Sequence, residues 1–239
     1  MALDMQSIYV LASGGSRAME QLDSVTNNLA NVNTDGFKKS LIKEMSQRLD
    51  ENGGDANHLL VFPRFRETLI DRTQGPLRQT GNPLDLGLEG DGYFVVQTPA
   101  NDRFLTRSGH FYLNEEGYLV DRNGNLLLSD KDKPIQVDPR ERIDVTQEGG
   151  LYQKGELVAK IQLQNYEEVT LEGETYYLPK GNATEVSVKV RQGYLESSNV
   201  NPIEEMSEMI VAQRRFEMYN NIIKSLDQLN QKTNEIGKA

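Results

Sequence analysis

The chain shows helical periodicity at both ends and strand periodicity between them, and this arrangement limits its possible folds most strongly. In residues 1–34, apolar side chains recur every three or four positions, which predicts an amphipathic helix. The same spacing returns in residues 201–236, and it begins at Asn201 and Pro202, which suit the cap and the first position of a helix. One helix of about 35 residues would be about 50 Å long, so we expect it to project from a compact domain.

The middle of the chain, residues 58–192, alternates apolar and polar side chains and is divided by turn-forming residues. Residues 157–163 and 186–190 show this period of two most clearly, which is typical of strands. Asn123 and Gly124 give the strongest turn signal, because this pair favours the backbone of a two-residue hairpin. We therefore expect a mostly antiparallel β domain that contains this hairpin.

Together these patterns predict an α+β fold. The N- and C-terminal long helices are expected to pair as a coiled-coil-like stalk around a central, mostly antiparallel β domain. The expected division is a helical assembly segment at 1–37, a connecting segment at 38–75, a β-rich domain at 76–192 and a second helical assembly segment at 193–239.

Composition excludes several classes of function. The chain has 36 acidic and 26 basic residues and a net charge of -10, which disfavours binding to nucleic acid. It has no cysteine, so disulfides, thiolate metal sites and cysteine nucleophiles are excluded. The longest apolar stretch near the start, residues 8–12, is too short for a membrane span or the core of a signal peptide. We expect neither a nucleic-acid partner nor direct membrane insertion.

Candidate catalytic residues are scarce. The two histidines, His58 and His110, lie in no nucleophile elbow, and a surface or edge-strand position is the simpler interpretation of both. Residues 121–132 lack the glycine at the sixth position that a calcium-binding loop needs. The glycines at 87, 90 and 92 fit neither the dinucleotide-binding nor the phosphate-binding spacing. We therefore expect no catalytic residue, no cofactor and no metal site, and we predict that the chain is not an enzyme.

The face of the first helix away from its apolar stripe is poor in charge. Only four charged residues occur in residues 1–34, whereas asparagine and glutamine are frequent, and amides can bond to other backbones without a counter-charge. Packing between copies is therefore favoured over pairing of the two ends within one chain, which the same stripes also allow.

Several motifs carry a family resemblance. Residues 28–38 (NLANVNTDGFK) closely resemble the N-terminal signature of bacterial flagellar basal-body rod and hook proteins. Residues 193–202 (GYLESSNVNP) and 214–218 (RRFEM) are similar to the C-terminal block of the same family. Residues 90–96 (GDGYFVV) and 106–109 (TRSG) match its middle in style, whereas residues 130–190 match no motif.

The resemblance implies a structural protein of the basal body. It implies helical self-assembly into a tubular periplasmic drive shaft that transmits torque, with the terminal helices in an inner tube and the β domain in an outer layer. It also implies export through the flagellar export apparatus without a cleaved signal peptide. The expected partners are copies of the chain itself, other rod or hook-family subunits and the export apparatus.

Within the family, two rod types compete. Residues 214–218 and the short length resemble the proximal rod type, whereas residues 31–34 and 193–196 resemble the distal rod type. Distal-type chains usually carry a longer segment after the N-terminal signature than residues 38–75, so the proximal type is favoured. Outside the family, two hypotheses remain open: a β-rich carbohydrate-active enzyme with a carboxylate pair in a cleft, and an adhesin-like coiled-coil oligomer with closed symmetry.

The predicted assembly interface joins residues of the two helical patterns and the N-terminal signature. Its members are Met19, Leu22, Asn28, Leu29, Asn31, Val32, Asn33, Gly36, Phe37, Ile203, Met206, Met209, Ile210, Arg215, Phe216, Tyr219, Ile223, Leu226 and Leu229.

Overall fold

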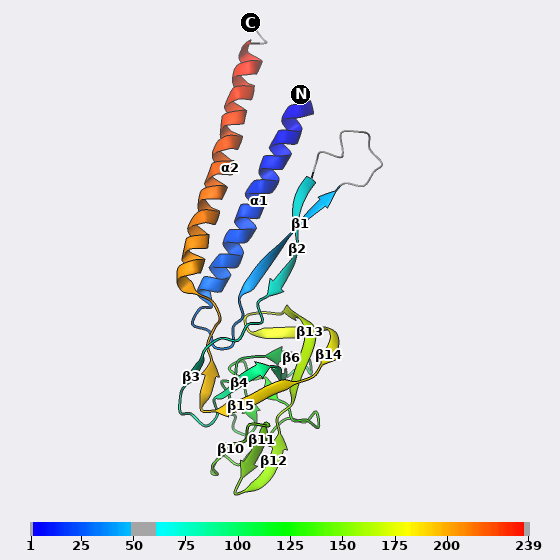
Figure 1. Ribbon diagram of the computed structural model, residues 1–239, viewed down its shortest axis with the longest axis vertical. Coiled ribbons are helices and arrows are strands. Elements are labelled where there is room, and N and C mark those ends of the chain that lie inside the picture. The colour runs from blue at the N-terminus through cyan, green and yellow to red at the C-terminus, as the bar shows by residue number, and fades with distance from the viewer. Residues whose placement is uncertain (1, 49–60, 237–239) are drawn as a thin grey trace. The chain divides into compact units, whose positions relative to one another are not determined.

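A computed structural model describes residues 2–48 and 61–236 of the 239-residue chain (Figure 1). His58 lies outside the described residues. The chain divides into two compact units. The helical unit comprises Met1–Ala30, Ser40–Leu69 and Asn201–Ala239, and the β unit comprises Asn31–Lys39 and Ile70–Val200. The chain therefore passes between the units four times, after residues 30, 39, 69 and 200.

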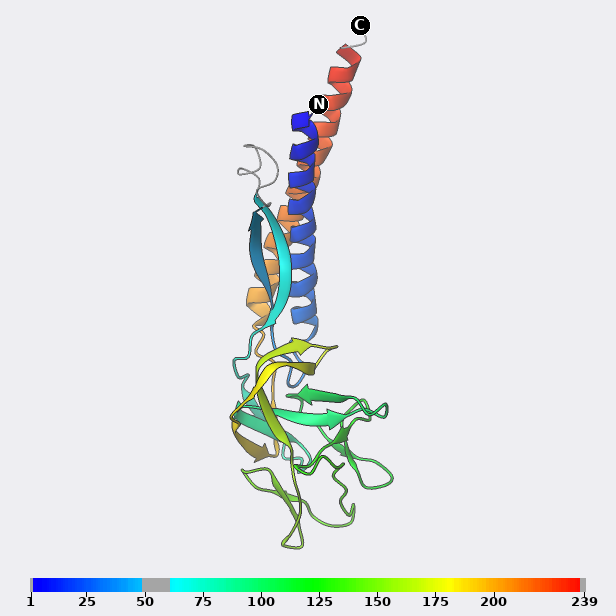
Figure 2. The same ribbon diagram turned by 90° about the vertical axis from the view of Figure 1, so that its right-hand side faces the viewer.

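The helical unit holds helix α1 (Ala2–Ala30), helix α2 (Pro202–Ile236) and a two-stranded sheet of β1 (Ser40–Arg48) and β2 (Val61–Ile70), whose last residue falls in the β unit. The two helices pack along each other, and β1 packs on α1, as the two views in Figures 1 and 2 show.

The ends of the helices follow from local chemistry. The Asn201 side-chain oxygen accepts a hydrogen bond from the amide of Ile203, which confirms the predicted cap of α2. Glu204 and Glu205 occupy the first turn, where negative charge is favourable. Helix α1 ends at Ala30, four residues before the predicted end at 34, because residues 31–36 form successive turns closed at Gly36 with a φ of 76°.

The expected coiled-coil-like stalk around a central β domain is wrong. In the part of the chain that the structure describes, there are two helices among many strands, and the helices belong to a unit of their own. They pair only in part, through contacts that run from Asn28 and Glu205 to Gly14 and Tyr219. The physical reason is that the buried positions of α1 include Gly14, Gly15, Ala18 and Asn28, which are too small or too polar for a heptad seam.

The described strands of the β unit pair in antiparallel fashion, as the sequence predicts. Its largest sheet has the strand order β13-β14-β6-β5-β9-β8-β7. Strand β13 also pairs with β5, so β13, β14, β6 and β5 form a closed ring. The strands of this sheet are β5 (Tyr93–Gln97), β6 (Arg103–Thr106), β7 (Tyr112–Leu113), β8 (Leu119–Val120), β9 (Leu126–Leu127), β13 (Leu163–Leu171) and β14 (Tyr176–Thr184).

Three smaller sheets complete this unit. They are β10 (Asp144–Val145), β11 (Gly150–Gln153) and β12 (Glu156–Lys160) in one sheet, β4 (Leu86–Asp91) with β15 (Ser187–Gln192), and β3 (Leu77–Gln79) with β16 (Tyr194–Glu196).

Strand β5 lies at the centre of the core. Its alternate side chains enter two apolar clusters: Phe94 and Val96 pack in one, and Tyr93 and Val95 pack in the other. A strand buried on both faces has a continuous apolar sequence, and residues 93–96 (YFVV) show this.

The predicted hairpin at Asn123-Gly124 is confirmed in position, between β8 and β9. Its length was predicted wrongly. Asp121 and Asn125 form the closing pair, because the Asp121 amide donates to the Asn125 carbonyl, so three residues lie between them. Gly124 has a φ of 80°, the left-handed residue that closes a three-residue loop.

Candidate assembly surface

The contact between α1 and α2 centres on a notch of two glycines. A Cβ atom added at Gly14 would lie 2.6 Å from Cε1 of Tyr219, whereas one at Gly15 would lie 3.7 Å from the Tyr219 Cβ. Ala18 and Ala212 are buried, so small side chains line both helices at this contact. The absence of a side chain at Gly14 therefore makes room for the Tyr219 ring, and this fit determines how the helices align.

Polar contacts join the helices at their other end. The buried Asn28 side chain donates to Oε2 of Glu205 at 3.1 Å and to the Ser40 carbonyl at 3.0 Å. Its oxygen accepts from the Ser40 amide at 2.8 Å. Arg215 donates to Gln21 at 3.4 Å. The asparagine of the N-terminal signature thus bonds to a backbone, as the amide-rich face suggests, but within the same chain.

The predicted apolar stripe of α2 divides into two faces. Met209, Phe216, Tyr219, Ile223 and Leu226 are half-buried and share their side of the helix with the buried Glu205 and Ala212. We call this the inner face. At 100° per residue, Ile203, Met206 and Ile210 lie on the opposite side. They are exposed, and Leu229 is exposed near the same side.

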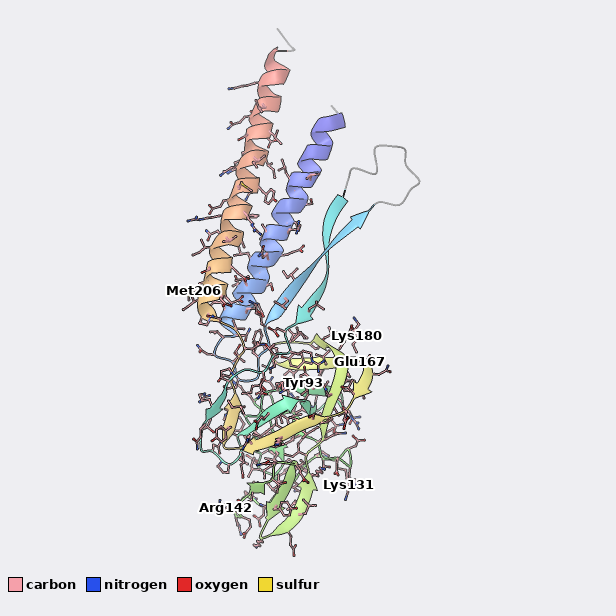
Figure 3. All side chains as sticks on the ribbon, in the orientation of Figure 1. Tyr93, Lys131, Arg142, Glu167, Lys180 and Met206 are labelled. Carbon is pink, nitrogen blue, oxygen red and sulfur yellow. The ribbon has the colours of Figure 1, made fainter. Side chains whose placement is uncertain are left out.

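Further exposed apolar residues join that opposite side. Val211, Met218 and Ile222 were absent from the predicted interface. We call Ile203, Met206, Ile210, Val211, Met218, Ile222 and Leu229 the outer face. The exposed fraction reaches 74% at Ile203 and 60% at Leu229. Figure 3 shows Met206 on the side of α2 turned away from α1. A groove of about 470 Å³ runs between side chains of Arg214, Glu217, Met218, Asn221, Ile222, Ser225 and Leu226.

The predicted residues of α1 and its signature have different environments. Met19 is exposed, Leu22 and Leu29 are half-buried, and Asn28 is buried. Beyond the helix, the signature residues belong to the β unit: Asn31, Gly36 and Phe37 are buried, Val32 is half-buried and Asn33 is exposed. A Cβ at Gly36 would lie 2.3 Å from the Ser108 amide nitrogen, so this position is closed by the chain itself.

A buried group of charges in the β unit was missed by the sequence reasoning. The Glu196 carboxylate pairs with Lys38 at 2.6 Å and with Arg107 at 3.1 Å. The side chains of Glu196, Lys38 and Arg107 are exposed by 0%, 1% and 2%. Each comes from a different motif of the family resemblance, at residues 28–38, 106–109 and 193–202, so the available signal was a charged residue inside each motif.

Few of the described side chains are arranged as a catalytic or metal-binding site requires. His110 Nδ1 lies 2.5 Å from Oδ1 of the buried Asp85, and the His110 ring packs on Tyr112. Across residues 2–48 and 61–236, no cluster of three metal-binding side chains occurs. Neither described helix combines the length and the apolar character that a membrane crossing requires.

Three models of protein families match successive segments of the chain. "Flagella basal body rod protein" matches residues 8–38, "Flagellar hook protein FlgE/F/G D1 domain" matches residues 87–191, and "Flagellar basal body rod FlgEFG protein C-terminal" matches residues 191–236. The flagellar basal-body rod protein FlgF of Mesorhizobium japonicum is 34% identical over 219 residues, which cover 88% of this chain and 89% of the relative. The chain belongs to the flagellar basal-body rod protein family.

Other rod proteins are similar over most of their length. FlgF of Caulobacter vibrioides is 32% identical over 88% of this chain and 89% of its own length. FlgG of Bacillus subtilis is 29% identical over 94% of this chain and 96% of its own length. The family is one of structural proteins, so this chain is a structural subunit of the flagellar basal-body rod.

Proposed function

We propose that this rod subunit assembles helically into a tubular shaft that transmits torque, and that the outer face of α2 is its principal contact with neighbouring subunits. One observation carries the proposal: a long helix already uses its inner face within the chain, and it still exposes large apolar side chains along its opposite side. Contiguous exposed apolar surface is typical of sites that bind another protein.

The contact is proposed to be between different surfaces of successive copies. The outer face of α2 would meet the exposed side of α1, where Met19 lies, rather than a second outer face. Contacts between unlike surfaces produce an open helical array when the rotation does not close, and a tube grows in this way. Arg214, beside the groove, offers a cation to the acidic surface of a neighbour.

The proximal rod type is proposed over the distal type. The alignments with FlgF relatives span 219 to 221 positions at 32 to 34% identity. Alignments with FlgG relatives of Bacillus subtilis and Caulobacter vibrioides span 255 and 265 positions at 29% identity, which exceeds the 239 residues of this chain. Those relatives therefore contain inserted residues that this chain lacks, which supports the shorter, proximal type.

Membership of the family supports the remaining parts of the proposal. The proposed partners are copies of the chain, other rod or hook subunits and the flagellar export apparatus. The proposed location is the periplasm, and the proposed export needs no cleaved signal peptide. We also propose that the subunit has no catalytic activity. Replacing His110 with asparagine should accordingly leave motility intact, and a motility defect in a variant that still folds would contradict the proposal.

The test of the proposed contact is a charge on the outer face. Ile210→Glu is expected to keep its melting temperature, because the side chain is half exposed. It should reduce incorporation into basal bodies at least tenfold, since one buried charge per interface costs several kcal/mol and tenfold corresponds to about 1.4 kcal/mol. The matched control is Gln147→Glu, which adds the same charge at an exposed position of the β unit, away from the outer face. Equal incorporation of both variants would refute the outer face as the contact.

A further inference from the structure

One carboxylate in the β unit is surrounded by donors from three distant parts of the chain. Oε1 of Glu196 accepts from Nζ of Lys38 at 2.6 Å and from the Gly75 amide at 3.0 Å. Oε2 accepts from Nη1 of Arg107 at 3.1 Å. The centroid of the Tyr93 ring, a residue labelled in Figure 3, lies 5.1 Å from the Arg107 guanidinium carbon. The site is closed to water, because all three charged side chains are buried.

The segments that bear these residues are the connections to the helices. Residues 31–39 follow α1, and residues 194–200 precede α2. The two connections bond to each other: the Gly36 amide donates to the Glu196 carbonyl at 2.7 Å, and the Lys39 amide donates to Oδ1 of Asn199 at 2.7 Å. The Asn199 side chain also donates to the carbonyls of Asp71 and Thr73.

The ion pairs of this cluster contain two cations and one carboxylate. Two cations, Lys38 and Arg107, share Glu196, which is the only carboxylate in an ion pair with either of them among the described residues. Their other acceptors are backbone carbonyls, that of Thr73 for Lys38 and that of Gly90 for Arg107. A buried charge without a partner is strongly destabilising. Without Glu196, neither cation would keep an ion pair among the described residues, and Lys38 would keep only the longer-range attraction of Asp71.

We infer that Glu196 is a positioning residue that fixes both helix connections in the β unit by charge, so that the core around Lys38 and Arg107 becomes stable only when the segment before α2 is in place. The two connections then pack in the β unit together, because Lys38 belongs to the segment after α1 and its ion-pair partner Glu196 belongs to the segment before α2. This inference concerns the folded chain itself and does not depend on the proposed tube.

The test compares three variants of the full chain by thermal unfolding. Glu196→Gln keeps the size of the side chain and removes its charge, so the melting temperature should fall by roughly 10 °C. The matched control is Glu89→Gln, which breaks the exposed pair between Glu89 and Arg191 at 2.7 Å and should shift the melting temperature by less than about 3 °C.

The decisive variant is Glu196→Gln combined with Lys38→Met. If charge imbalance is the cause, the double variant should melt at a higher temperature than Glu196→Gln alone, although it has lost more hydrogen bonds. Exchange of the Gly36 and Lys39 amides should rise in Glu196→Gln and fall again in the double variant.

Two results would overturn the inference. One is a Glu196→Gln protein that melts within about 3 °C of the parent. The other is a double variant that is no more stable than Glu196→Gln, including the case in which neither folds while Glu89→Gln does. A double variant that folds where Glu196→Gln does not would support the role of charge.

Discussion

Tyr219 of α2 occupies the space that a side chain at Gly14 of α1 would need. A Cβ at Gly14 would lie 2.6 Å from Cε1 and 2.7 Å from Cζ of the Tyr219 ring. Two adjacent glycines in a helix interior cost stability relative to alanine, by about 1 kcal/mol each. Packing against Tyr219 therefore explains why residue 14 is a glycine, and Gly15 provides a control.

Gly14→Ala is expected to lower the free energy of unfolding of the helical unit by about 1 to 3 kcal/mol, because the methyl group overlaps the tyrosine ring. Gly15→Ala should be neutral or stabilising by up to about 1 kcal/mol, since its Cβ would lie at an ordinary distance of 3.7 Å from Tyr219. Hydrogen exchange of the α1 amides measures both. Equal effects of the two substitutions would contradict the claim that Gly14 makes room for the Tyr219 ring.

Asn28→Ala should destabilise the helical unit by about 1 to 3 kcal/mol, because the Ser40 amide and carbonyl and the Glu205 carboxylate lose a buried partner. Asn33→Ala, at an exposed turn position of the same signature, should change stability by less than about 0.5 kcal/mol. Denaturant unfolding followed by circular dichroism compares them. Similar losses would show that the amide of Asn28 has no special role.

Stability is expected to rise with pH in the alkaline range because of Lys38. Burial lowers the pKa of Lys38 from its usual 10.5, an effect that Glu196 opposes. Between the lowered pKa and 10.5, the unfolded chain binds a proton that the folded chain does not, so the folded state gains up to about 1.4 kcal/mol per pH unit. Below that window, both states are protonated and this contribution is constant.

The pH measurement is best made below pH 10. Burial raises the pKa of Tyr93 and of Tyr177, so above pH 10 their ionisation in the unfolded chain lowers stability and opposes the effect of Lys38. Denaturant midpoints of the parent and of Lys38→Met, taken across the alkaline range, isolate the lysine. A parent whose slope equals that of Lys38→Met would contradict a lowered pKa.

The inner and outer faces of α2 should respond differently to truncation. Phe216→Ala should loosen the pairing of α1 and α2 by about 2 kcal/mol, because this ring is half-buried on the inner face. Met218→Ala, on the outer face, should leave that pairing unchanged and reduce incorporation into basal bodies. Far-ultraviolet circular dichroism and recovery of the subunit in basal bodies separate the two effects. The proposed roles of the two faces would be contradicted if Met218→Ala loosened the helix pairing and Phe216→Ala reduced only the incorporation into basal bodies.

The sequence predicted the features that depend on near neighbours. The cap at Asn201, the turn at Gly124 and the alternation of the strands each depend on a few adjacent residues, and the structure contains all three. The three-residue length of the hairpin loop escaped because Asp121 and Asn125 form the closing pair, which the Asn-Gly signal alone does not specify.

Features that depend on distant contacts were missed. The sequence analysis predicted one apolar stripe in α2, whereas the helix has two apolar faces. Successive steps of three or four residues each change the direction of the side chain a little, and over the length from Ile203 to Phe216 the two side chains come to point to different sides. The Glu196 cluster escaped because Lys38 lies 158 positions and Arg107 lies 89 positions away along the chain. No local pattern encodes such a meeting, although a charged residue inside each of the three motifs is a reason to look for one.

The most direct test of the proposed contact uses a photo-reactive amino acid at residue 210 on the outer face or at residue 216 on the inner face, in cells that build complete basal bodies. Position 210 is predicted to form covalent adducts with neighbouring rod subunits, and position 216 is predicted to form adducts within its own chain, to α1. Intermolecular adducts at 216 together with none at 210 would contradict the account.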